Sequence, residues 1–186
     1  MAKNSGDTRM PTPTTDAATK TATSNNGALE IHERIASKAV VRLRKIIDDK
    51  ERDGFTKDAT QFKFGTLSRG LAEKYQELTG TKIINRDMYT GASSLFHHRG
   101  GEKADKGKET PLEDIANMPI NIGAMDVFLF KNEIIFTDYK NKYVLKPNQR
   151  VKTENGRIIV TNHVSNSKVK DMDLFTRANG YKKINP

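Results

Sequence analysis

The spacing of apolar residues changes near Gly123, and this change limits the folds that the chain can adopt. Before Gly123, apolar side chains recur mostly at steps of three and four residues, as they do in helices that bury one face. After it, short runs rich in β-branched and aromatic residues alternate with turn signals, which is typical of antiparallel strands. The sequence therefore predicts an α+β fold in which three to four N-terminal helices precede a small antiparallel β-meander.

The predicted helices follow a polar N-terminal tail. The first spans residues 28 to about 52, with an apolar stripe along one side. The next two span residues 68–78 and 85–97, and Gly80 separates them. A short fourth helix is expected to begin at Pro111, because proline favours the first turn of a helix.

The predicted strands lie in the last third of the chain. Six short runs have strand character: residues 126–131, 133–138, 142–146, 151–153, 157–162 and 181–184. Pro147 is expected to end the third run, because proline cannot donate to a strand ladder. Asn155-Gly156 predicts a tight hairpin turn between the fourth run and the fifth.

Composition divides the chain into four parts. Residues 1–27 have no aromatic or branched aliphatic side chain, and we expect a disordered tail because they cannot offset the entropy cost of ordering. Residues 28–98 are the predicted helical region, and residues 99–110 are a Gly-rich, charged segment predicted to be a flexible loop. Residues 111–186 are the predicted basic β-rich region.

Several classes of protein are excluded by what the sequence lacks. It has no cysteine, which rules out a disulfide scaffold, a zinc ribbon and a thiol nucleophile. No apolar run approaches the roughly 20 residues that span a bilayer, so no membrane contact is expected. The opening residues have no apolar signal region, and we expect a cytoplasmic protein. No metal or cofactor is expected, since His97 and His98 diverge on a helix and Asp171-Met172-Asp173 lacks the other ligands of a metal loop.

The positive charge of the chain is concentrated at its C-terminal end. The formal net charge is +9, yet residues 28–139 carry 18 basic and 18 acidic side chains. Residues 140–186 carry 11 basic side chains against three acidic ones, a net charge of +8. A segment of this charge density attracts phosphates and releases their counterions. The leading prediction is therefore a nucleic-acid-binding protein that is not an enzyme, with DNA and RNA both open.

The predicted contact surface lies on the basic strands and turns. Cations interleaved with tyrosine suit nucleic acid, because lysine and arginine hold phosphates while aromatic rings stack on bases. The residues expected to bind nucleic acid are Lys140, Lys142, Tyr143, Lys146, Arg150, Lys152 and Arg157. In an alternative interpretation, Tyr143 packs in the core and the cations are only solvated.

A helix-turn-helix over residues 68–98 is a second possible route to DNA. Gly80 would lie at the bend, and the second helix would face the major groove. Its groove-facing side chains would be Arg86, Tyr89, Thr90, Ser93 and Ser94. The neutral charge balance of residues 28–139 argues against this route, because a DNA-reading helix belongs to a basic surface.

Two other functions remain open from the sequence. A small metal-independent ribonuclease, of the kind found among toxins, needs an acid or base beside phosphate-binding cations. His163 is the candidate acid or base, and Arg150 and Lys140 are candidate phosphate clamps, together with Arg157. The carboxylate partner would be Glu133, Asp138 or Glu154. The other function is a structural or assembly protein whose basic region docks on an acidic partner.

Overall fold

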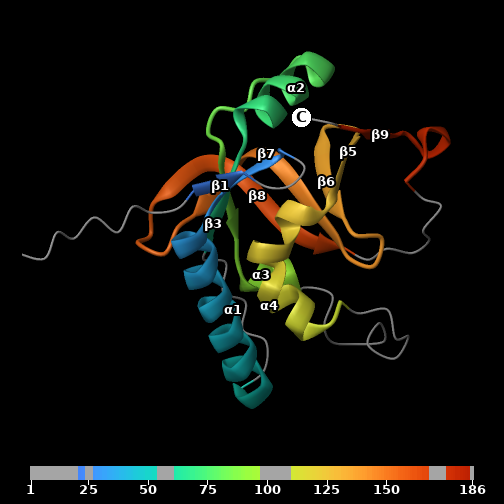
Figure 1. Ribbon diagram of the computed structural model, residues 1–186. Coiled ribbons are helices and arrows are strands. Elements are labelled where there is room, and N and C mark those ends of the chain that lie inside the picture. The colour runs from blue at the N-terminus through green and yellow to red at the C-terminus, as the bar shows by residue number, and fades with distance from the viewer. Residues whose placement is uncertain (1–20, 24–26, 54–60, 97–109, 168–174, 185–186) are drawn as a thin grey trace, which may run out of the picture.

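A mixed β-sheet joins the N-terminal and C-terminal parts of the chain (Figure 1). The structure is a computed structural model, and it describes residues 21–23, 27–53, 61–96, 110–167 and 175–184. Within these residues the sheet has nine strands in the order β1-β2-β3-β4-β8-β7-β6-β5-β9. They are β1 (Thr21–Thr23), β2 (Leu29–His32), β3 (Phe62–Leu67), β4 (Asp87–Thr90), β5 (Asp126–Phe130), β6 (Glu133–Thr137), β7 (Lys142–Lys152), β8 (Ile158–Ser167) and β9 (Tyr181–Lys183).

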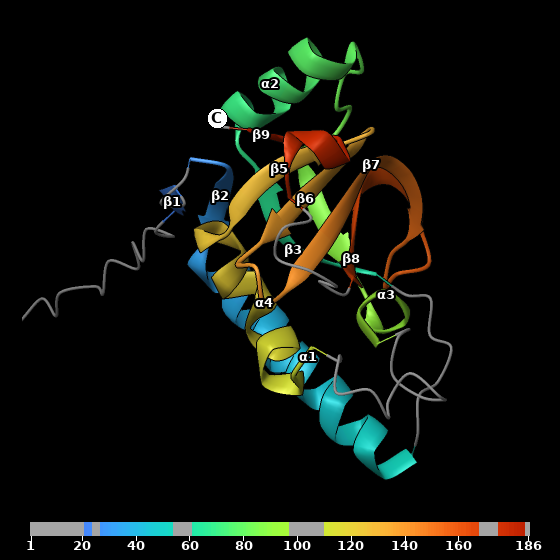
Figure 2. The same ribbon diagram turned by 90° about the vertical axis from the view of Figure 1, so that its right-hand side faces the viewer.

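Helices lie on one side of this sheet and at one end of it. In the described part of the chain they are α1 (Glu33–Asp53), α2 (Arg69–Thr79), α3 (Ala92–Phe96) and α4 (Leu112–Asn121). α1 and α4 lie side by side (Figure 1, Figure 2), and Arg44 of α1 forms an ion pair with Glu113 of α4 at 2.5 Å. α2 lies near the β5–β6 turn, where Tyr75 Oη donates to Asn132 O at 3.0 Å. None of these helices is long and apolar enough to cross a membrane.

Buried side chains lie on both faces of the sheet, because neighbouring residues of a strand point to opposite faces. The larger cluster packs the helices against one face and includes Leu43, Leu71, Ile115, Phe136 and Tyr143. The smaller cluster lies on the other face of the meander and consists of Phe128, Ile135, Val144 and Tyr181. The sheet is therefore apolar on both sides along β5, β6 and the first half of β7.

The predicted C-terminal meander is confirmed in part, because the runs 142–146 and 151–153 form one strand, β7. β5, β6, β7 and β8 each pair antiparallel with the next, and β9 adds to β5 at the edge of the sheet. Gly156 has φ +77°, the left-handed conformation that the predicted Asn155-Gly156 turn requires. The prediction for Pro147 is wrong, because this residue lies inside β7, where the register shifts between Lys146 and Gln149. A β-bulge tolerates the missing N–H of proline.

The fold prediction for the N-terminal half is only partly right. Residues 29–32 form β2, so α1 begins at Glu33 rather than at residue 28. Phe62–Leu67 forms β3, which the sequence did not predict. Residues 21–23, at the end of the predicted disordered tail, form β1 and pair with β2. Residues 1–20 and 24–26 of that tail and residues 99–109 of the predicted loop lie outside the described residues. The small meander is thus the C-terminal part of a larger mixed sheet.

The predicted helix over residues 85–97 is wrong, and the helix-turn-helix fails with it. Residues 87–90 form β4, and only Ala92–Phe96 are helical. β4 pairs antiparallel with β3 and parallel with β8, where Met88 lies opposite Asn162. Two neighbouring strands supply hydrogen-bond partners that an isolated segment lacks, so tertiary pairing overrides the helical spacing. The segment therefore offers no recognition helix to a DNA groove.

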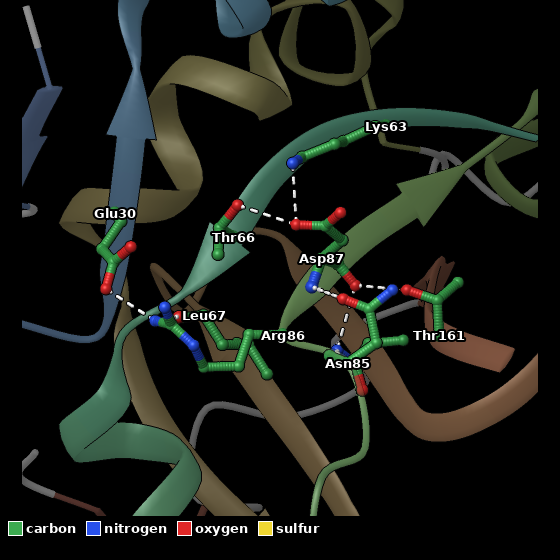
Figure 3. A network of polar contacts seen from close by, with 9 residues as sticks. Glu30, Lys63, Thr66, Leu67, Asn85, Arg86, Asp87 and Thr161 are labelled. Atoms are coloured by element: carbon green, nitrogen blue, oxygen red, sulfur yellow. Dashed lines mark hydrogen bonds and ion pairs between the residues drawn. The ribbon is translucent and has the colours of Figure 1, made fainter.

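A network of polar contacts fixes the start of β4 between its neighbours (Figure 3). Arg86 Nη1 donates to Glu30 Oε1 of β2 at 2.6 Å and to Leu67 O of β3 at 2.7 Å. Lys63 Nζ of β3 lies 2.7 Å from Asp87 Oδ1. These side chains tie β2, β3 and β4 together at the point where the sequence favoured a helix.

The β7–β8 hairpin curls back towards β3. Gln61, directly before β3, forms a parallel bridge with Thr153 at the end of the hairpin. Gln61 N donates to Lys152 O at 2.9 Å. This bridge brings the basic C-terminal hairpin beside strands from the region that the sequence predicted to be helical.

Candidate nucleic-acid interface

The predicted contact residues fall into two groups along β7 and β8. Lys140, Lys142, Tyr143 and Lys146 precede the bulge in β7, beside the packed meander. Arg150, Lys152 and Arg157 follow it, on the part of the hairpin that curls towards β3. The two groups have different surroundings.

Tyr143 belongs to the core, as the alternative interpretation of the sequence had it. Its side chain is fully buried within the larger cluster, and its Oη donates to Asp114 O at 3.3 Å. Burial raises the pKa of the phenol well above its ordinary value, so the group stays neutral. A ring with no exposed face cannot stack on a base, and the prediction that Tyr143 contacts nucleic acid is not supported by this position.

The three lysines before the bulge have partners within the protein. Lys140 Nζ lies 2.8 Å from Asp114 Oδ2, and Lys146 Nζ lies 3.6 Å from Glu133 Oε1. Lys142 Nζ lies 3.5 Å from Tyr181 Oη, and burial lowers the pKa of this lysine from its ordinary value. Contacts within the protein therefore partly compensate the charges of these lysines, which attract a phosphate less strongly as a result.

Arg150, Lys152 and Arg157, which we name the distal cations, are exposed. None of them forms an ion pair with any residue that the structure describes. Lys152 lies opposite Ile158 and Arg150 lies opposite Val160 in the ladder, so these four side chains share a face of the hairpin. Ile158 and Val160 are 62% and 39% exposed. The hairpin thus presents uncompensated positive charge next to apolar surface.

A hollow of about 410 Å³ lies between the end of this hairpin and strands β3 and β4. We name it the hairpin hollow; its lining includes Gln61, Lys63, Tyr89, Asn155, Arg157 and Ile159. Its volume falls within the range of about 300–1,000 Å³ that holds small ligands. Strands from three separate parts of the chain thus contribute to one cationic, partly aromatic recess.

The charges around the hairpin hollow are only partly balanced. Lys63 is paired with Asp87, and Glu154 on the rim is paired with Arg42 of α1. Arg157 has no such partner among the described residues, and it leaves a net positive charge at the rim. Burial, together with the nearby carboxylate of Asp87, raises the pKa of Tyr89, which keeps its ring neutral.

His163, the predicted acid or base of a ribonuclease, lies on β8 opposite Lys146 of β7 and Tyr89 of β4. Its Nε2 is 2.6 Å from Ser94 Oγ, which also accepts a hydrogen bond from Gln61 Nε2 at 3.1 Å. The structure places His163 opposite Tyr89, which lines the hairpin hollow with the proposed clamp Arg157, whereas the clamps Arg150 and Lys140 lie elsewhere.

The proposed phosphate clamps and carboxylates of the ribonuclease are dispersed. Arg150 lies opposite Val160, and strand alternation puts residues 160 and 163 on opposite faces of β8. Lys140 lies before the start of β7, paired with Asp114. Of the carboxylates, Glu133 is paired with Lys146 and Glu154 with Arg42, while Asp138 Oδ1 accepts hydrogen bonds from the N–H groups of residues 140 and 141.

Comparison with known proteins assigns no family to this geometry. No family model, curated protein or solved structure matches the chain. The distal cations and the hairpin hollow are therefore the basis on which a function is argued.

The part of the candidate interface that lies before residue 100 was not predicted from the sequence. Lys63 and Tyr89 belong to residues 28–139, whose positive and negative charges balance, so the charge count gives no signal there. The sequence also predicts a helix at Tyr89 rather than a strand. The alternation in Phe62-Lys63-Phe64 was a signal for a strand with one exposed cation. No group of His, Asp and Glu side chains in the described residues could hold a metal ion, and His97, His98 and Asp171–Asp173 lie outside those residues.

Proposed function

We propose that this protein binds nucleic acid through the β7–β8 hairpin, with phosphates held by the distal cations. The observation that carries the proposal is that Arg150, Lys152 and Arg157 are exposed and unpaired within the described residues, whereas Lys140 and Lys146 have acidic partners. Unpaired cations attract phosphates with no competing carboxylate to displace. The exposed Ile158 and Val160 beside them are not needed on a surface that serves only solubility.

A salt titration tests the electrostatic part of this proposal. Each neutralised phosphate of a single strand contributes about −0.7 to the slope of log affinity against log salt concentration. Three contacts therefore predict a loss of about 20-fold in affinity between roughly 50 and 200 mM salt. Fluorescence anisotropy with a labelled 20-nucleotide oligomer measures it, and no binding at the lower salt concentration overturns the proposal.

Charge reversal tests the position of the interface. In the triple variant R150E/K152E/R157E, we expect affinity to fall by at least ~10-fold and the salt slope to approach zero. The matched control K131E/R177E/K182E changes the net charge equally, at exposed residues by the β5–β6 turn and near β9. An equal loss in both variants would mean that overall charge, rather than the hairpin, drives binding.

The other two predicted functions stay predictions. The ribonuclease would need His163 and a cation to meet at one phosphate, and Arg150 of β7 lies on the other face of the hairpin. A structural or assembly protein would use the same distal cations on an acidic protein partner, and its capture would survive nuclease treatment. The anisotropy titration separates it from the leading proposal, because an oligonucleotide would then not bind.

A further inference from the structure

The hairpin hollow contains an exposed part of an aromatic ring in the middle of a row of side chains. Tyr89 lies opposite Lys63 on β3 and opposite His163 on β8, so its ring is flanked by both in the ladder. It is half-buried and lines the hollow. A neutral ring held rigidly on a strand is the platform on which proteins stack single bases.

Gln61, which lines the hollow, is held in place by hydrogen bonds. Gln61 is only 7% exposed, its Nε2 donates to Ser94, and its backbone N donates to Lys152 O. Its Oε1 has no hydrogen-bond partner among the described residues. This oxygen is itself buried from solvent, so it is not open to a ligand, and Gln61 instead fixes the start of β3 against the hairpin.

The rim of the hollow offers a place for a phosphate. Arg157 lines the hollow and forms no ion pair in the described part of the chain. Its guanidinium can hold a phosphate through two parallel hydrogen bonds. The recess therefore combines an aromatic ring and an unpaired cation, which match the base and the phosphate of one nucleotide.

We infer that the hairpin hollow holds one unpaired base of a single-stranded nucleic acid, stacked on Tyr89, with the adjoining phosphate on Arg157. The inference rests on the proposed function and names its ligand class. A base in a duplex is stacked on its neighbours and paired along its edge, so it cannot enter a recess on the sheet without leaving the helix. Single strands expose both the face and the edge of each base.

The chain has no tryptophan, which gives the inference a direct optical test. Tyr89→Trp places the sole indole of the protein in the hairpin hollow. We expect a 15-nucleotide single strand to quench its emission over the same concentrations that raise the anisotropy of a labelled strand. The same sequence annealed to its complement should leave the emission unchanged, and quenching by both forms alike would overturn the inference.

Removal of the ring provides the second arm. Tyr89→Ala should weaken binding of the single strand by about 5- to 150-fold, the range measured for one stacked base, and should leave duplex binding unchanged. Tyr89→Phe, the matched control, keeps the ring and should bind as the wild type does. Melting curves identify a variant that fails to fold, in which case the Tyr89→Trp titration decides.

The outcomes separate this inference from the proposed function. If Tyr89→Ala binds the single strand as the wild type does while R150E/K152E/R157E does not, the hairpin binds phosphates but the hollow holds no base. If the triple variant also binds normally, the proposed function itself fails.

Discussion

Substitutions of Tyr143 distinguish its place in the core from the role that the sequence first suggested. The ring is fully buried, so truncation to alanine should lower the free energy of unfolding by about 3–5 kcal/mol. Tyr143→Phe keeps the ring and loses only the hydrogen bond to Asp114 O, which is 3.3 Å long, so it should cost about 0.5–1 kcal/mol. Tyr143→Leu removes the ring but keeps apolar volume, and its cost should lie between these values.

Urea denaturation followed by circular dichroism measures the three free energies, and anisotropy measures nucleic-acid binding of the folded variants. We expect stability to fall in the order Phe, Leu, Ala, whereas affinity stays at the wild-type value for every variant that is folded in the assay. Suppose that Tyr143→Leu is folded in the absence of urea and still binds nucleic acid ten times more weakly than the wild type. That result would refute the core assignment, because it would mean that the ring contacts a base.

Two further predictions concern acid stability and catalysis. The pKa of Asp126 is held below its ordinary value of 3.8 by hydrogen bonds from Tyr139 and Lys183, so this contact stabilises the fold above that pH and is lost as the pH falls through the lowered pKa. The urea midpoint of Asp126→Asn should therefore depend less on pH below about 4 than that of the wild type. If the two midpoints change with pH in the same way, Asp126 is not the source of the acid sensitivity. Labelled RNA incubated with the protein in EDTA should stay intact, because His163 of β8 and Arg150 of β7 lie on opposite faces of the hairpin. Cleavage by the wild type that His163→Ala abolishes would instead support the ribonuclease.

The C-terminal meander was predictable because its signals are local. Residues 126–138 alternate with a turn at 131–132, and Asn155-Gly156 has the conformation that its sequence favours. Each of these features depends on a few neighbouring residues, so tertiary contacts did not need to be known. The helical stripes of α1 and α2 were recognisable for the same reason.

The strands in the first half of the chain were not predictable in this way. Met88 and Tyr89 have side-chain spacing compatible with a helix, and their strand conformation depends on β3 and on β8, whose residue Asn162 lies 74 positions later. The candidate interface was not predictable for the same reason, because the segments that form it are far apart in the sequence. Because charges were summed by segment, Lys63 counted as part of a neutral region, although it lines the same hollow as Arg157.

The bridge between Gln61 and Thr153 joins the two parts of the sheet that border the hairpin hollow, so the binding that we infer there would require the complete fold. Its two residues are 92 positions apart, and contacts of such separation carry a high loop-closure entropy and form slowly. A chain in which only the meander has folded has the distal cations but no recess between β3, β4 and the hairpin. If nucleic acid occupies the recess as we infer, it should bind the fully closed sheet alone, and the melting temperature should then rise with the logarithm of ligand concentration.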